Sequence, residues 1–307
     1  MSFYNNFGRF EALAQSLPLT AGKVFFVADN SDAWFERLQR MFPVDIDGEI
    51  RLFSNLDTAV GACTAGRGDV IIVFPNYTMT VTAASGLNLD VAGITLLGLG
   101  SGTNKPTIDF TTVATADVDV GAANITVDNF RFISSDTVDV TAAIDVNAAH
   151  FTLKNCDLYI GDTSSQFTRT IVNDSNNYLT VDRCRFLGDT NLIENVIDIV
   201  GGEGHRITNS YFFCATNDSQ APIINSATAT RMLYVDNNVL INASGDTTAF
   251  AFFGLASATG TVSNNTFQVT ADAGHCVSTG GNLSFTQNFC TNNVGESGFL
   301  DPDVSVT

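Results

Sequence analysis

The stretch ITVDNFRF at residues 125–132 opens a pattern that recurs along the second half of the chain at a nearly constant period. Its counterparts are FTLKNCDL from Phe151, LTVDRCRF from Leu179, HRITNSYF from His205, LYVDNNVL from Leu233, GTVSNNTF from Gly260 and LSFTQNFC from Leu283. The fifth position of this phrase advances by 26, 28, 26, 28, 27 and 23 residues. Self-similarity at such a period is typical of a solenoid, in which each turn packs only on its neighbours.

Within the phrase, apolar and polar side chains alternate. The apolar Ile125 and Val127 flank the polar Thr126, which is the period of two expected for a strand with one face in a core. The fifth residue, usually Asn, interrupts the alternation, and Asn both tolerates left-handed backbone conformations and hydrogen-bonds locally. We therefore expect a tight corner at this position. Asparagines of successive turns could also form a hydrogen-bonded ladder.

A second short strand precedes each phrase. Its members are VDV at 118–120, IDV at 144–146, IVN at 171–173, IDI at 197–199 and IIN at 223–225. Each turn thus contains a strand, a loop, a strand, an Asn corner and a third strand, which predicts an all-β, right-handed parallel β-helix. The 223 residues from Gly68 to Cys290 then correspond to about eight coils and a rod of roughly 40 Å.

The segments that flank the rod are predicted to cover its ends. Residues 54–67 indicate a capping helix, because Ser54 and Asp57 have capping-box spacing and Leu56, Ala59 and Val60 form one apolar face. We expect this face to lie across the open end of the first coil, since open strand edges promote aggregation. The polar C-terminal tail, residues 291–307, is expected to cover the last coil loosely.

Residues 1–53 do not follow the repeat and are interpreted as an N-terminal attachment segment. VFFVA at 24–28 predicts a strand, and SDAWFERLQRMF at 31–42 predicts an amphipathic helix. Two readings of this helix stay open: it packs against the rod, or it binds a partner. The candidate partner-binding residues are Trp34, Phe35, Arg37, Leu38, Arg40, Met41 and Arg51.

The charge of the chain excludes some functions. Its formal net charge is −18, of which residues 1–67 carry −2 and residues 68–307 carry −16. A surface this acidic repels phosphate backbones, so we expect no nucleic-acid partner. No apolar run reaches 18 residues, so we expect no membrane span, and there is no signal-peptide pattern. Synthesis in a reducing cytoplasm predicts buried, reduced thiols at Cys156 and Cys184 rather than a disulfide.

Enzymatic chemistry has limited support. Polysaccharide cleavage requires two carboxyl groups, and the candidates are Asp119, Asp145 and Asp198, each the outward middle residue of its strand. Asp119 and Asp145 should lie on neighbouring coils, where like charge would raise one pKa, as a general acid requires. Val172 interrupts the row before Asp198, so we interpret these residues as weak candidates. The three widely spaced histidines predict no metal site, and no cofactor is expected.

The sequence from Arg51 to Val81, RLFSNLDTAVGACTAGRGDVIIVFPNYTMTV, is followed at 91–110 by VAGITLLGLGSGTNKPTIDF. Together these stretches resemble the opening of pectate-lyase-like right-handed β-helix proteins. From Val24 onward the chain also resembles β-helix proteins encoded among the structural genes of tailed, notably marine, bacteriophages. The calcium-binding acid cluster and catalytic Arg of pectate lyases have no recognisable match in this chain.

The resemblance implies a non-enzymatic virion structural protein that is made in the host cytoplasm. It would be a head decoration or cement protein on the capsid exterior. Its expected partners are the major capsid protein or another virion protein, bound through residues 1–53, and it would form a homotrimer. The alternatives are a tailspike-type polysaccharide depolymerase and an adhesin that binds a host surface glycan.

Overall fold

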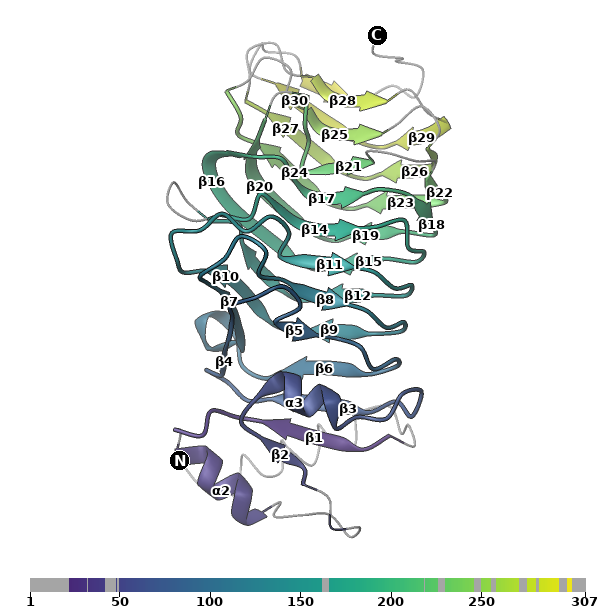
Figure 1. The fold of residues 1–307 in the computed structure, drawn as a ribbon. Coiled ribbons are helices and arrows are strands. Elements are labelled where there is room, and N and C mark those ends of the chain that lie inside the picture. The colour runs from purple at the N-terminus through teal and green to yellow at the C-terminus, as the bar shows by residue number, and fades with distance from the viewer. Residues whose placement is uncertain are drawn as a thin grey trace, which may run out of the picture.

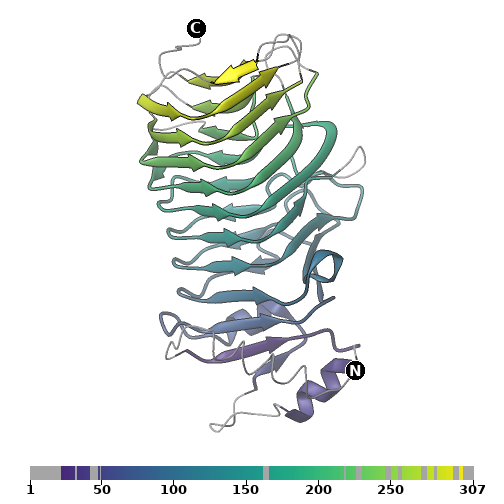
Figure 2. The ribbon, with the colours of Figure 1, turned by 180° about the vertical axis from the view of Figure 1, so that it is seen from behind.

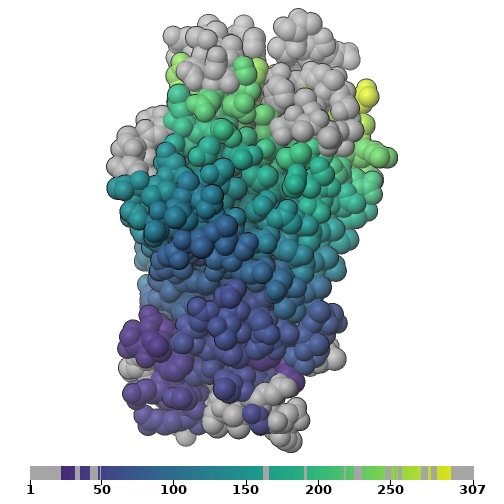
Figure 3. All heavy atoms as spheres, viewed as in Figure 1, coloured from purple at the N-terminus to yellow at the C-terminus, as the bar shows by residue number. Residues whose placement is uncertain are grey.

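The computed structural model is a parallel β-helix in which three long sheets wind around one apolar core (Figure 1). It describes residues 22–31, 33–41, 48, 50–161, 166–217, 219–225, 230–245, 250–254, 258–270, 275–279, 282–292 and 297–299. The rod rises in the right-handed sense, as parallel crossovers almost always do (Figures 1 and 2). In space-filling view the coils form one closely packed column (Figure 3).

We name the three sheets A, B and C in the order in which each turn of the chain visits them. Sheet A contains β2 (Leu52–Phe53), β1 (Val24–Val27), β3 (Val70–Val73), β6 (Thr95–Gly98), β9 (Thr126–Asp128), β12 (Thr152–Lys154), β15 (Thr180–Asp182), β19 (Arg206–Thr208), β23 (Leu233–Asp236), β26 (Thr259–Ser263) and β29 (Asn282–Thr286), in that spatial order.

Sheet B contains β4 (Thr78–Val81), β7 (Thr107–Phe110), β10 (Arg131–Ser134), β13 (Asp157–Tyr159), β16 (Arg185–Ile193), β20 (Tyr211–Thr216), β24 (Val239–Asn242), β27 (Thr266–Val269), β30 (Phe289–Asn292) and the antiparallel β31 (Ser297–Phe299). Sheet C contains β5 (Leu87–Asn88), β8 (Val118–Val120), β11 (Ile144–Val146), β14 (Arg169–Asn173), β17 (Asn195–Ile199), β21 (Ile223–Asn225), β25 (Phe250–Gly254) and β28 (His275–Thr279). The remaining elements are α2 (Ala33–Met41), α3 (Leu56–Gly61), the 3₁₀ helix η1 (Gly102–Asn104), and the pair β18 (Gly202–Glu203) and β22 (Thr230–Arg231).

The predicted repeat is confirmed. From β3 onward sheet A has nine parallel strands in the described residues, against the expected eight or so coils. The fifth position of every phrase adopts the left-handed conformation: φ is 65° at Asn129, 55° at Asn155, 53° at Arg183, 53° at Asn209, 55° at Asn237, 55° at Asn264 and 54° at Gln287. The corner is therefore set by the position in the coil, and it is kept even where Arg or Gln replaces Asn.

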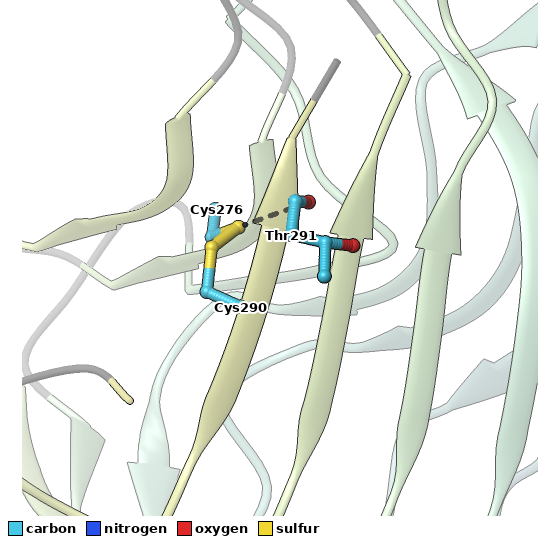
Figure 4. Close-up of a disulfide and its surroundings, with 3 residues drawn as sticks. All are labelled: Cys276, Cys290 and Thr291. Atoms are coloured by element: carbon cyan, nitrogen blue, oxygen red, sulfur yellow. Dashed lines mark hydrogen bonds between the residues drawn. A yellow bond between two sulfur atoms is a disulfide. The ribbon is translucent and has the colours of Figure 1, made fainter. Parts of the chain in front are cut away.

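The core is filled mainly by inward aliphatic and Phe side chains. Phe186 and Phe212, on adjacent strands of sheet B, stack with ring centroids 4.6 Å apart. Cys156 and Cys184 are buried and free, as expected. A disulfide that was not expected joins Cys276 of β28 to Cys290 of β30 across the last coil (Figure 4).

The N-terminal boundary of the rod differs from the expectation that the β-helix begins at residue 68. Strand β1 pairs in parallel with β3, and β2 pairs with β1, so both belong to sheet A. Phe25 and Val27 of β1 are buried in the rod's core. The segment 1–53 is thus partly built into the rod.

Helix α3 caps the core but is shorter than residues 54–67. Asn55, rather than Ser54, is the N-cap, because its side-chain oxygen accepts a 2.9 Å hydrogen bond from the Thr58 N–H. Leu56, Ala59 and Val60 are buried as predicted. Asp57 accepts a 3.0 Å hydrogen bond from the backbone of Asn88 in β5, so the helix covers the open edge of sheet C.

Candidate functional surfaces

Two of the three candidate acidic residues lie together on the outer face of sheet C. Asp119 of β8 is directly opposite Asp145 of β11, as the repeat predicts. The next strand carries Val172 at this position, and Asp198 of β17 follows it. The structure therefore brings Asp119 and Asp145 together and leaves Asp198 two coils from Asp145.

One amide links the two adjacent carboxylates. The side-chain nitrogen of Asn147 donates to Asp119 Oδ1 and to Asp145 Oδ2, each at 3.0 Å, so these oxygens are at most twice that distance apart. Ser85 lies beside them and hydrogen-bonds to Asp119 at 3.4 Å and, through its backbone N–H, to Asp117. The Asn147 amide thus already bridges one oxygen of each carboxylate.

The pKa of one member of the pair is raised, as the sequence predicts. Burial raises the pKa of Asp145, the hydrogen bond from Asn147 opposes this rise, and the neighbouring charge of Asp119 adds to it. Burial also raises the pKa of Asp117, against the hydrogen bond from Ser85. A carboxyl group with a raised pKa could serve as a general acid, so this row has one property of a hydrolytic site.

Asp198 has a different environment. Its carboxylate lies 3.5 Å from the guanidinium of Arg169, which also contacts Glu194 at 3.3 Å. Asp198 is largely buried, whereas Glu194 is about half exposed. Arg169 thus ties two adjacent strands of sheet C together, and Asp198 serves as one of its anchors.

The candidate partner-binding residues of the N-terminal segment divide into two groups. Leu38 is buried, and Phe35 packs against the same apolar cluster, which includes Phe26 and Ile72 on the outer face of sheet A. Arg51 donates a 3.2 Å hydrogen bond to the Val24 carbonyl. These three residues therefore fix the segment to the rod, so the packing interpretation is correct for them.

The other group is exposed, and α2, which carries most of it, lies at the N-terminal end of the rod (Figure 1). Arg37, Arg40 and Met41 are exposed, and Arg40 pairs with Glu36 at 3.2 Å along the helix. Ile50, a residue that the sequence did not single out, is 60% exposed. We call Arg37, Arg40, Met41 and Ile50 the N-terminal patch. The side chain of Trp34, and residues 1–21 and 42–47, lie outside the described part of the chain.

One surface was missed at the sequence level. Continuing the alternation of each phrase one step beyond its eighth residue leads to the outward residues Ile133, Tyr159, Leu187, Phe213 and Ile241. They belong to consecutive strands of sheet B, and all are partly exposed. The sequence carries this signal, because the residue after the phrase is apolar in five consecutive coils.

Other classes of site receive no support from the described residues. Among them, no cluster of three or more His, Cys, Asp or Glu side chains is placed to hold a metal ion. No helix within the described ranges has the length and apolarity needed to cross a membrane. No protein-family model, curated protein or solved structure matches the chain.

Proposed function

We propose that this protein is a non-enzymatic virion structural protein of a tailed bacteriophage. It decorates or cements the head, lies on the capsid exterior and binds the major capsid protein or another virion protein through its N-terminal segment. It assembles as a homotrimer. The virion role comes from the sequence resemblance described above, and the exposed outer face of α2 supports the proposed attachment site.

The observation that carries the proposal is the two-sided character of helix α2. Its inner face is held on sheet A by Leu38, and its outer face presents Arg37, Arg40 and Met41. Basic residues are scarce in this chain, with 14 Lys and Arg against 32 Asp and Glu. An exposed face that combines arginines with an apolar side chain suits an acidic and apolar protein surface.

Two experiments test the virion role. Quantitative mass spectrometry of purified particles should find tens to hundreds of copies, as decoration of a head requires. A handful of copies would favour a tailspike, and absence from the particle would overturn the proposal. The second experiment measures binding to particles that lack the protein.

Binding should be tested by charge reversal, because deletion of residues 1–53 would remove β1 and open the core. The variant Arg37→Glu/Arg40→Glu should lose particle binding at least tenfold while retaining the circular dichroism and melting temperature of the parent. Its matched control is Arg206→Glu/Arg231→Glu, which reverses two exposed arginines farther along the rod. Equal binding by both variants would contradict the role of the N-terminal patch.

A second function, polysaccharide cleavage, is favoured by the paired Asp119 and Asp145 and by the raised pKa of Asp145. A reducing-sugar assay on host capsular polysaccharide distinguishes it from decoration. Cleavage activity that disappears in the variant Asp119→Asn/Asp145→Asn would establish a depolymerase and overturn the non-enzymatic proposal. Binding of the polysaccharide by the protein without cleavage would instead indicate an adhesin.

A further inference from the structure

The outer face of sheet B carries an apolar stripe that the rod itself does not require. The sheet B stripe consists of Ile133, Tyr159, Leu187, Phe213 and Ile241, from β10, β13, β16, β20 and β24. Leu187 is directly opposite Phe213, and Phe213 is directly opposite Ile241. At about 4.8 Å per strand the stripe is roughly 19 Å long. Leu192 of β16, which is opposite Ala215 of β20, is 41% exposed.

The stripe points away from the core. The residues that fill the interior of the same strands are Phe132, Leu158, Phe186, Phe212 and Leu240, all buried. An outward position of a β-helix does not need an apolar residue: on sheet A, the column Thr95, Thr126, Thr152 and Thr180 occupies equivalent outward positions with threonine. Five consecutive apolar residues on a solvent-facing sheet therefore indicate a surface that becomes covered.

The charged side chains beside the stripe are mainly basic. Asp157 contacts Lys105 at 2.9 Å and Arg185 at 3.6 Å, and the guanidinium of Arg131 lies 4.6 Å from the ring centroid of Tyr159. The adjacent outward row thus alternates in sign through Arg131, Asp157 and Arg185. By contrast, the corresponding row of sheet C holds the acidic pair Asp119 and Asp145.

The charge of this face points to a second copy of the chain as the partner. Two copies of a chain with a net charge of −18 repel each other wherever their acidic faces meet. At sheet B they present apolar side chains bordered by Lys105, Arg131 and Arg185, with Asp157 buried between them, so this face adds little to that repulsion. We infer that the sheet B stripe is the surface through which copies of this protein pack side by side, stripe against stripe.

The inference does not depend on the virion role. Self-association through sheet B concerns the purified protein alone, whereas attachment through the N-terminal patch requires a particle. Experiments can separate self-association from particle binding, because the two interactions involve different partners and different residues. A protein that associates normally and does not bind particles would contradict only the proposed function.

Sedimentation equilibrium tests the surface directly. The parent protein, with a chain mass of 32.7 kDa, should sediment as an oligomer at micromolar concentration. Leu187→Asp/Phe213→Asp should shift it to the monomer, with at least a hundredfold weaker association. The matched control, Thr152→Asp/Thr180→Asp, places the same charges on adjacent outward positions of sheet A and should stay oligomeric. A monomeric parent, or equal association by both variants, would overturn the inference.

Two further measurements keep the test decisive if the aspartate variant folds poorly. Association should survive 1 M NaCl, because apolar burial is not screened by salt, whereas loss of the oligomer in salt would indicate charged faces instead. A photoreactive benzoylphenylalanine at position 213 should cross-link to peptides from sheet B of a second copy. Cross-links confined to sheet A or sheet C peptides would refute the stripe-to-stripe contact.

Discussion

Asn238 and Asn265 lie one above the other in adjacent coils, and the amide oxygen of Asn265 accepts two hydrogen bonds from Asn238. One comes from the backbone N–H of Asn238 at 2.9 Å and the other from its side-chain nitrogen at 3.0 Å. Asn265 repeats the relationship with Asn288 at 3.0 Å. All three side chains are buried. This inner ladder follows the corner position by one residue and satisfies backbone groups that the turn leaves without a strand partner.

Removing one member of this ladder should destabilise the rod. Asn265→Ala removes the acceptor of the Asn238 N–H and the side-chain donor to the Val235 carbonyl in the core, so the free energy of unfolding should fall by about 2–4 kcal/mol. Urea denaturation followed by circular dichroism measures it. Asn265→Ser is the informative comparison, because Ser210 already fills the equivalent place and accepts from Cys184 N–H at 3.1 Å. If the serine variant is as unstable as the alanine variant, lost packing rather than lost hydrogen bonding is responsible.

Asp69 should be the main acid-sensitive point at the N-terminal end. Its buried carboxylate accepts bonds of 2.7 Å from Lys23 N, Thr64 N and two nitrogens of Arg67. Burial alone would raise its pKa, but these donors and the charge of Arg67 outweigh burial and lower it. Its stabilisation is therefore present above the unfolded pKa of about 3.9 and is lost as the pH falls through the lower folded value.

The corresponding variant is Asp69→Asn, which should lose about 2–4 kcal/mol at pH 7. It should also show a weaker loss of stability than the parent below pH 4. Asp90→Asn makes the same charge change at an exposed position, so its effect should stay within about 0.5 kcal/mol. Identical acid profiles for Asp69→Asn and the parent would show that other carboxylates control the acid transition.

His205 should make stability depend on pH near neutrality. Its ring is buried, Nδ1 accepts from the Leu179 N–H at 3.3 Å, and Nε2 donates to the Gly201 carbonyl at 2.9 Å. Burial lowers its pKa, against the opposing effect of the Gly201 bond. The neutral ring stabilises the fold above the unfolded pKa of about 6.5, and this contribution is lost as the pH falls through the lower folded value.

The variant His205→Gln should be about 1–2 kcal/mol less stable than the parent at pH 7.5. The difference in the free energy of unfolding should shrink as the pH falls from 7.5 to 5, because protonation of His205 destabilises only the parent. The matched control is His150→Asn, which removes a histidine at an exposed corner. A constant difference between His205→Gln and the parent across this range would refute titration of His205 as the cause.

The sequence was most informative where the coil repeats. Inward residues such as Ile125 and Val127 recur because every coil must fill the same cross-section, so the strands, the corners and the pairing of Asp119 with Asp145 could all be predicted. It was less informative where the period fails. Val24 pairs with Val70, 46 residues later, because two helices lie between them, and no repeat of about 26 residues links β1 to the rod.

Contacts that depend on the path of the loops could not be predicted from the sequence either. Arg169 reaches Asp198 across one coil boundary because the strands β14 and β17 start in register at Arg169 and Asn195. Neither residue type nor spacing distinguishes this ion pair from the exposed acids beside it. The same holds for Phe35 and Leu38: their apolar face was evident, but whether it covers sheet A or a partner could be decided only by the packing.

The disulfide between Cys276 and Cys290 should stabilise the C-terminal coil. The two residues are 14 apart, less than one coil, and the bond joins sheet C to sheet B. Closing a loop of this size contributes about 2–3 kcal/mol, so Cys276→Ser/Cys290→Ser should unfold at correspondingly lower urea concentration. In the denatured, unreduced protein a thiol assay should count the four free cysteines Cys63, Cys156, Cys184 and Cys214, and full reduction should add two. Six reactive thiols without reductant would show that the bond does not form, and the serine pair would then match the parent in stability.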